Sequence, residues 1–60
     1  MEKFGYFKFR IYQKDIDNWQ YEIFDENDKV LRHSEENYRF QGIARFAAIG
    51  HITLLEQQKG

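Results

Sequence analysis

The sequence contains no cysteine. Without thiols the chain can form neither a disulfide nor a metal site built on thiolates. This matters in a chain of 60 residues, because small domains are marginally stable and usually gain stability from disulfides, a metal or a partner subunit. Aromatic side chains remain available, 6 Phe, 4 Tyr and 1 Trp, and each can bury on the order of 150–250 Å². We therefore expect a single domain over residues 1–60, stabilised by aromatic burial, by self-association, or by both.

Two further absences limit the class of protein. Neither sign of charge is in excess, since 9 basic and 10 acidic residues give a net charge of −1, which argues against a dedicated polyanion binder. No apolar run is long enough to cross a bilayer. The apolar run of about seven residues or more that a signal peptide requires does not follow Glu2 and Lys3. These features predict a soluble, cytoplasmic protein that does not associate with membranes.

Three segments are predicted to be strands, at about residues 4–12, 19–24 and 29–33. The first two alternate apolar and polar residues with the period of two that is typical of half-buried strands. In the third an alternation is hard to assign, because Val30 and Leu31 are adjacent. Asn27 and Asp28 separate the last two segments, and both residue types tolerate the positive φ of a tight hairpin turn. The pattern predicts three antiparallel strands in chain order.

From residue 40 to residue 57 the apolar residues recur at helical spacing and form two stripes. We expect the first stripe, which contains Ile43, Phe46, Ala47 and Leu54, to pack on the sheet. Together with the inward residues of the first two strands, it makes up the predicted core: Phe7, Phe9, Ile11, Trp19, Tyr21, Ile23, Ile43, Phe46, Ala47 and Leu54. The predicted fold is α+β, a three-stranded antiparallel sheet with one C-terminal helix packed on one face.

The second stripe consists of Ala44, Ala48, Ile52 and Leu55. A helix that is apolar on two sides is usually buried on two sides, and one small sheet covers only one of them. Either a second chain covers this stripe, or the helix breaks near Gly50 and its last turns fold back onto the core. Small size and the lack of cysteine favour the second chain. We therefore predict a homodimer that uses this stripe, the strand edges, or both.

One pattern extends from residue 19 to residue 52: an aromatic strand, a polar turn, a Val-containing strand, a Ser-Glu and Tyr segment, and a helix containing Ala and Gly. It is carried by Trp19-Gln20-Tyr21-Glu22-Ile23, Lys29-Val30-Leu31, Ser34-Glu35, Tyr38, Ala44, Ala48-Ile49 and Ile52. This arrangement resembles the repeat of YegP-like small bacterial domains. It departs from that repeat at Asn27-Asp28, where the family has Asn-Gly, and in a spacing from Tyr38 to Ile49 that is one residue longer. The resemblance implies a three-stranded sheet with one packed helix, as tandem repeats or as single repeats that dimerise. It implies no site, because the function of the family is uncharacterised.

The sequence offers no metal site. A zinc site needs three or four converging ligands, and His33 and His51 are the only histidines. His33 with Glu35 and Glu36 could hold a weakly bound ion, but solvated residues at a strand end are the favoured interpretation. We expect His51 to be exposed.

A calcium loop and a catalytic centre are equally poorly supported. The segment 25–36 has the length of a calcium loop, but Lys29 and Val30 occupy positions that require an oxygen ligand and a glycine. A nucleophilic Ser34 or Thr53 would need a positioned base, and so short a chain hardly encloses a substrate pocket. The sequence predicts no catalytic residue, no metal and no cofactor.

One strand face suggests a second function. Tyr6, Lys8, Arg10 and Tyr12 alternate with apolar residues and so share one side of the first predicted strand. Single-stranded nucleic-acid binders interleave rings and cations in this way, because bases stack on the rings and phosphates meet the charges. The same residues also suit a solvated edge strand or a protein interface.

These patterns predict a small non-enzymatic protein-interaction or regulatory module that acts as a homodimer. Two alternatives are open. The chain could bind single-stranded nucleic acid through Tyr6, Lys8, Arg10 and Tyr12, or it could be a small inhibitor of a larger protein.

Overall fold

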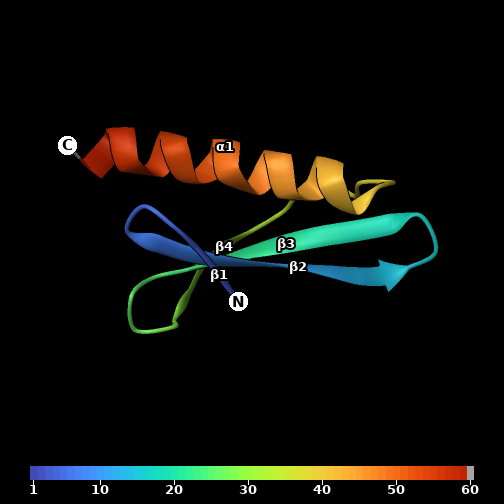
Figure 1. The fold of residues 1–60 in the computed structure, drawn as a ribbon, viewed down its shortest axis with the longest axis horizontal. Coiled ribbons are helices and arrows are strands. Elements are labelled where there is room, and N and C mark those ends of the chain that lie inside the picture. Colours follow the sequence, from blue (N-terminus) through green and yellow to red (C-terminus); the bar gives the residue numbers. More distant parts are fainter. Residues whose placement is uncertain (60) are drawn as a thin grey trace.

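In the computed structural model, which describes residues 1–59, one long helix lies across a single face of a four-stranded antiparallel sheet (Figure 1). The strands lie side by side in chain order, β1-β2-β3-β4. The elements are β1 (Glu2–Phe4), β2 (Phe7–Asp15), β3 (Asn18–Phe24), β4 (Val30–His33) and α1 (Gln41–Lys59). The α+β class and the single C-terminal helix are thus confirmed.

Each of the three strand connections contains one residue with left-handed backbone. Gly5 has a φ of 62°, Asp17 of 56° and Asp28 of 64°. Gly and Asp are residue types that adopt such angles at low cost. The carboxylate of Asp25 stabilises the last turn by accepting the N–H groups of Asn27 at 2.8 Å and Lys29 at 2.9 Å. The predicted hairpin turn around Asn27 and Asp28 is confirmed.

The prediction of three strands is wrong, because residues 4–12 do not form one strand. Gly5 and Tyr6 make a two-residue turn, across which Phe4 pairs with Phe7. Glycine at the first position of a two-residue loop is typical of tight hairpins. The N-terminal residues therefore fold back as a separate edge strand, β1. The only sign of the break in the sequence is the change of phase from Phe4 to Phe7, which lie three residues apart with Gly5 between them.

The pairing of β2 with β3 divides the sheet into two faces. Paired residues lie opposite one another and share a face. On the face toward α1 the pairs are Phe9 with Ile23 and Ile11 with Tyr21. The outer sheet face, which points away from α1, carries Lys8 with Phe24, Arg10 with Glu22 and Tyr12 with Gln20.

The side of α1 that packs on the sheet is the second apolar stripe and not the first. Ala44, Ala48 and Ile52 are each 0% exposed, and Leu55 packs against the same cluster. The helix also continues through Gly50 without a break. The prediction that a second chain covers this stripe is therefore wrong, because Ala44, Ala48 and Ile52 are fully buried within the chain and Leu55 is partly buried. The alternative is confirmed in that Ile52 and Leu55 pack on the chain's own core, but its helix break is wrong.

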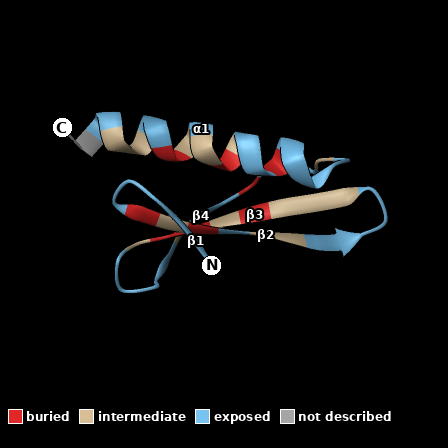
Figure 2. Cartoon of the chain, in the orientation of Figure 1, coloured by how far each residue is buried: buried red, intermediate tan, exposed pale blue. Residues whose placement is uncertain are grey.

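The first apolar stripe is correspondingly exposed. Phe46 is 82%, Leu54 58% and Ile43 51% exposed, and their assignment to the core is wrong. The physical reason is size: alanine side chains are short and allow the helix axis to approach the sheet closely, whereas phenylalanine at the same place would hold it away. Figure 2 shows the result, with buried residues on the sheet side of α1 and exposed residues on its far side.

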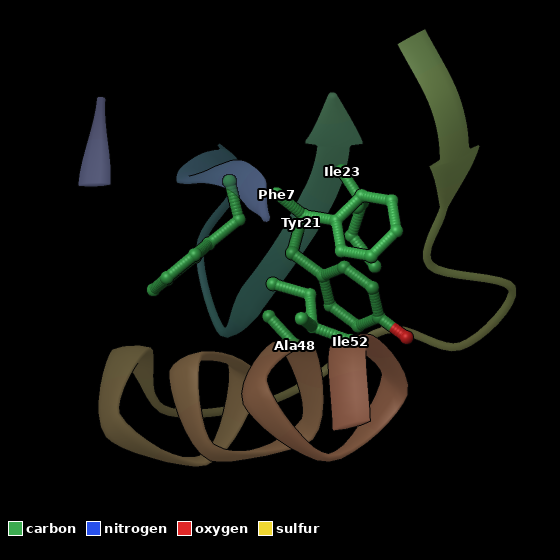
Figure 3. Packing of buried hydrophobic residues seen from close by; sticks show 6 residues of the cluster. Phe7, Tyr21, Ile23, Ala48 and Ile52 are labelled. Carbon is green, nitrogen blue, oxygen red and sulfur yellow. The ribbon is translucent and has the colours of Figure 1, made fainter. Parts of the chain in front are cut away.

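The core is a single small cluster between the sheet and the helix (Figure 3). Its buried members are Phe7, Phe9, Tyr21, Ile23, Ala48 and Ile52. The four predicted strand residues among them are confirmed. Ile11 and Ala47 are partly buried against the cluster, and Trp19 is half-buried.

One ion pair ties the N-terminal edge of the sheet to the helix. The guanidinium of Arg45 donates to the carboxylate of Glu2, with Nη2 at 2.7 Å from Oε1 and Nε at 3.1 Å from Oε2. This hydrogen bonding lowers the pKa of the Glu2 carboxyl. The pair joins β1, which is three residues long, to the first turns of α1.

The orientation of α1 can be tested with two substitutions of similar size on its opposite sides. Ile52→Ala should lower the free energy of unfolding by about 2–5 kcal/mol, because it leaves a cavity in the core. Leu54→Ala should change it by about 0.5 kcal/mol or less, because Leu54 is exposed. Urea denaturation at low micromolar protein concentration, followed by circular dichroism, measures both values. A larger loss for Leu54→Ala than for Ile52→Ala would contradict this orientation.

Candidate functional site

A cleft of about 340 Å³ opens where β3, β4 and α1 meet. Tyr21 comes from β3, His33 from β4 and His51 from α1, and the segment between β4 and α1 supplies the other lining residues, Glu35, Glu36 and Tyr38. This arrangement collects two imidazoles, two carboxylates and two phenols around one space. We refer to it below as the cleft.

Backbone hydrogen bonds hold the segment after β4 against β3. Ser34 is buried; its hydroxyl accepts the N–H of Tyr21 at 3.2 Å, and its own N–H donates to the Tyr21 carbonyl at 2.9 Å. Farther along, Tyr38 and Trp19 exchange N–H to carbonyl bonds of 2.9 and 2.6 Å. Glu35 and Glu36 are therefore fixed between two points attached to the sheet.

Tyr21 is the centre of the cleft's aromatic wall. Its ring stacks on that of Tyr38, with centroids 6.2 Å apart, and meets His51 edge-on at 5.9 Å. Its hydroxyl lies 2.9 Å from Nδ1 of His51, and Figure 3 shows it reaching toward α1. A buried tyrosine usually directs its hydroxyl to such a partner. This contact corrects the expectation that His51 is simply exposed, since the side chain is half-buried.

Two carboxylates line the cleft, those of Glu35 and Glu36. Burial raises the pKa of the Tyr21 phenol, and the neighbouring Tyr38, Glu35 and Glu36 act in the same direction. Burial and the Glu36 charge likewise raise the pKa of Tyr38. The ion pairs found among the described side chains, Lys8–Asp28, Arg10–Glu22 and Arg45–Glu2, include neither Glu35 nor Glu36. Both carboxylates therefore act on the cleft without a neutralising cation.

The cleft does not form a metal site in this conformation. Among residues 1–59, no group of three or more His, Cys, Asp or Glu side chains is placed to hold a metal ion. The sequence pattern connected His33 with Glu35 and Glu36 but missed His51 and both tyrosines. Only the hydrogen-bonding need of an inward-facing Tyr21 hydroxyl could have indicated them.

The outer sheet face brings together three of the four residues of the predicted nucleic-acid surface. Lys8 forms an ion pair with Asp28 at 2.8 Å and Arg10 with Glu22 at 2.6 Å. The Arg10 guanidinium also lies 5.1 Å from the ring centroid of Tyr12. Tyr6 lies apart from this face, in the turn between β1 and β2. Because both cations are paired with carboxylates, their charge is less available to phosphate groups than the sequence suggests.

The far side of α1 is a third surface, which we call the outward helix face. Its residues are exposed and follow one another at helical spacing on the side opposite Ala48. They are Ile43, Phe46, Gly50, Thr53, Leu54 and Gln57. This face carries no charged residue, and its three large side chains are apolar.

Comparisons with protein-family models, curated proteins and solved structures find no match to this chain. The resemblance to YegP-like domains therefore stays a prediction. Within the described residues, no helix has the length and apolarity needed to span a membrane.

The environment of Tyr21 predicts a specific alkaline sensitivity. The pKa of the Tyr21 phenol is raised in the folded chain. The neutral phenol therefore contributes stability at pH values below the ordinary tyrosine pKa of about 10. This contribution is lost as the pH rises through the raised pKa. Tyr21→Phe removes the contribution together with the bond to His51, which is worth about 1 kcal/mol. The stability difference between the wild type and the variant should therefore shrink as the pH rises above about 10. Denaturation curves at several alkaline pH values measure it, and a constant difference would contradict the assignment.

Proposed function

We propose that this chain is a small, non-enzymatic protein-interaction or regulatory module that works as a homodimer, with the outward helix face as its dimer interface. The observation that carries the proposal is the exposure of Ile43, Phe46 and Leu54 on one side of one helix. Contiguous apolar patches are uncommon on monomers and mark interaction sites. This face replaces the buried stripe that the sequence indicated.

The uncharged character of the outward helix face favours a second copy as the occupant. In a two-fold dimer the same patch meets itself, so a charge near the axis faces its own copy and repels it. No residue of this face carries such a charge. A partner of different sequence imposes no such condition on the patch.

The shape of the face fits the same arrangement. Phe46 projects one helical turn away from Gly50, and beyond the chain neighbours of Gly50 and the adjacent helix backbone no atom lies within 4 Å of the position that a Cβ on Gly50 would occupy. In an antiparallel pair of α1 helices with the two-fold axis level with residue 48, Phe46 of each copy lies opposite Gly50 of the other. Large side chains that enter the space over small ones are the basis of close helix packing.

The size of the chain supplies a further reason to associate. The buried hydrophobic cluster has only six members, and a domain of this length is marginally stable by itself. Burial of the exposed apolar side chains against a second copy would stabilise both, by roughly 25 cal/mol for each Å² removed from water. The sequence also resembles YegP-like domains, in which single repeats dimerise, and this resemblance supports the proposed dimer.

The dimer can be tested with two variants matched in exposure. Phe46 and Ile16 are both 82% exposed, but Ile16 lies in the turn between β2 and β3, away from the outward helix face. Light scattering after size-exclusion chromatography should show a wild-type dimer, a monomeric Phe46→Asp variant and a dimeric Ile16→Asp variant. Loss of a central aromatic contact should raise the dissociation constant at least about 30-fold. A monomeric wild type at high micromolar concentration, or a dimeric Phe46→Asp variant, would refute the proposal.

Gly50 allows a second test in which stability and association change in opposite directions. Gly50→Leu should stabilise the monomer by about 0.5–1 kcal/mol, because leucine is a better helix former than glycine. It should also weaken the dimer, because its side chain fills the space that receives Phe46 of the other copy. Thermal unfolding at high dilution measures the first effect, and sedimentation equilibrium measures the second. Unchanged or tighter association would exclude the antiparallel arrangement.

A further inference from the structure

We infer that the cleft receives an organic cation on an alkyl stem, the side chain of a lysine or arginine presented by a partner protein. The inference is independent of the proposed dimer, because the cleft is built from β3, β4 and the segment that follows β4, with His51 as its only contribution from α1. The outward helix face includes none of its residues.

The size of the cleft is sufficient for one extended side chain. Its volume of about 340 Å³ lies at the lower end of the range for small-ligand sites, about 300–1,000 Å³. The aromatic wall of Tyr21 and Tyr38 is one side, and the carboxylates of Glu35 and Glu36 also line the space. A long aliphatic stem can therefore lie along rings while its charged end meets oxygen atoms.

The charges of the cleft select a cation. Glu35 and Glu36 form no ion pair with a described side chain, whereas the carboxylates of Glu2, Glu22 and Asp28 are each paired with a cation of the chain itself. No lysine or arginine is among the residues that line the cleft. Burial is the main cause of the raised pKa of Tyr21 and Tyr38, and carboxylate charge adds to it, from Glu35 and Glu36 at Tyr21 and from Glu36 at Tyr38.

The aromatic rings distinguish an organic cation from a metal ion. An ammonium or guanidinium group gains from the face of a nearby tyrosine ring, and its N–H groups form charge-assisted hydrogen bonds with carboxylates. A metal ion would need several ligands at short distance, and among residues 1–59 no group of three or more His, Cys, Asp or Glu side chains is placed to supply them. The combination of Tyr38 with two unpaired carboxylates thus favours a basic side chain.

The inference can be tested with short capped peptides and amide NMR. We expect the peptide acetyl-Gly-Lys-Gly-amide to shift the signals of residues 33–38 and of His51. The matched norleucine peptide, which lacks only the charged ammonium group, should leave these signals in place. Glu36→Gln should weaken binding about fivefold, and the double variant with Glu35→Gln should weaken it further. Equal shifts with the norleucine peptide would overturn the inference.

Glu26→Gln is the matched control for charge. It changes the net charge by the same amount at an exposed position in the turn between β3 and β4, outside the lining of the cleft. Binding to this variant should equal binding to the wild type. If Glu26→Gln weakens binding as much as Glu36→Gln, the attraction is nonspecific and the site is refuted.

Two further titrations test whether the bound cation belongs to a protein side chain and whether its binding depends on the dimer. Tighter binding of the lysine peptide than of n-butylammonium would support a protein side chain as the natural ligand. Equal or tighter binding of n-butylammonium would contradict it. The Phe46→Asp variant should bind the peptide as the wild type does, because Phe46 is not part of the cleft. A loss of peptide binding in this folded variant would contradict the independence of the two surfaces.

Discussion

The close approach of two alanines to the sheet is the constraint on which the rest of the structure depends. Ala44 and Ala48, with Ile52 one turn farther on, are completely buried, and Ala48 and Ile52 pack in one cluster with strand residues such as Phe9 and Ile23. Their short side chains leave room for the large rings that the sheet supplies, so the bulk of the core comes from the strands. Once these positions face the sheet, the helical period determines where every other residue of α1 points.

That rotation makes α1 contribute to two separate surfaces, the outward helix face and the cleft. Phe46, at the opposite side of the helix from Ala48, is directed into solvent and becomes the centre of the outward helix face. His51, next to Ile52 in the chain, is directed along the flank of the sheet and meets the hydroxyl of Tyr21 at 2.9 Å. A helix turned with Phe46 inward would place neither side chain where it now lies.

The sequence predicts the elements of this fold better than their contacts. Periods of two and 3.6 residues identify β2, β3 and α1, because repeated side-chain spacing is a local property. The choice between the two apolar stripes is not local: it depends on the volume that Phe9 and Tyr21 leave between sheet and helix. The cleft was missed for the same reason, since Tyr21, Glu36 and His51 are distant in sequence and meet only after β3, β4 and α1 have packed. The division of the first predicted strand at Gly5 was missed because it depends on the left-handed backbone of one residue, which the composition of the segment does not show.

The distribution of apolar mass along α1 argues that its exposed side is used. A monomer would gain more by burying Phe46 than by burying Ala48, because the hydrophobic gain follows the area removed from water. The close packing of sheet and helix excludes that exchange, so the stability of a monomer gives no reason for phenylalanine, isoleucine and leucine on the solvent side, where polar residues suffice. Their presence together with Gly50, on a face without charge, is explained when a second helix occupies it. The hydrophobic stabilisation that the small core lacks is then supplied between chains rather than within one.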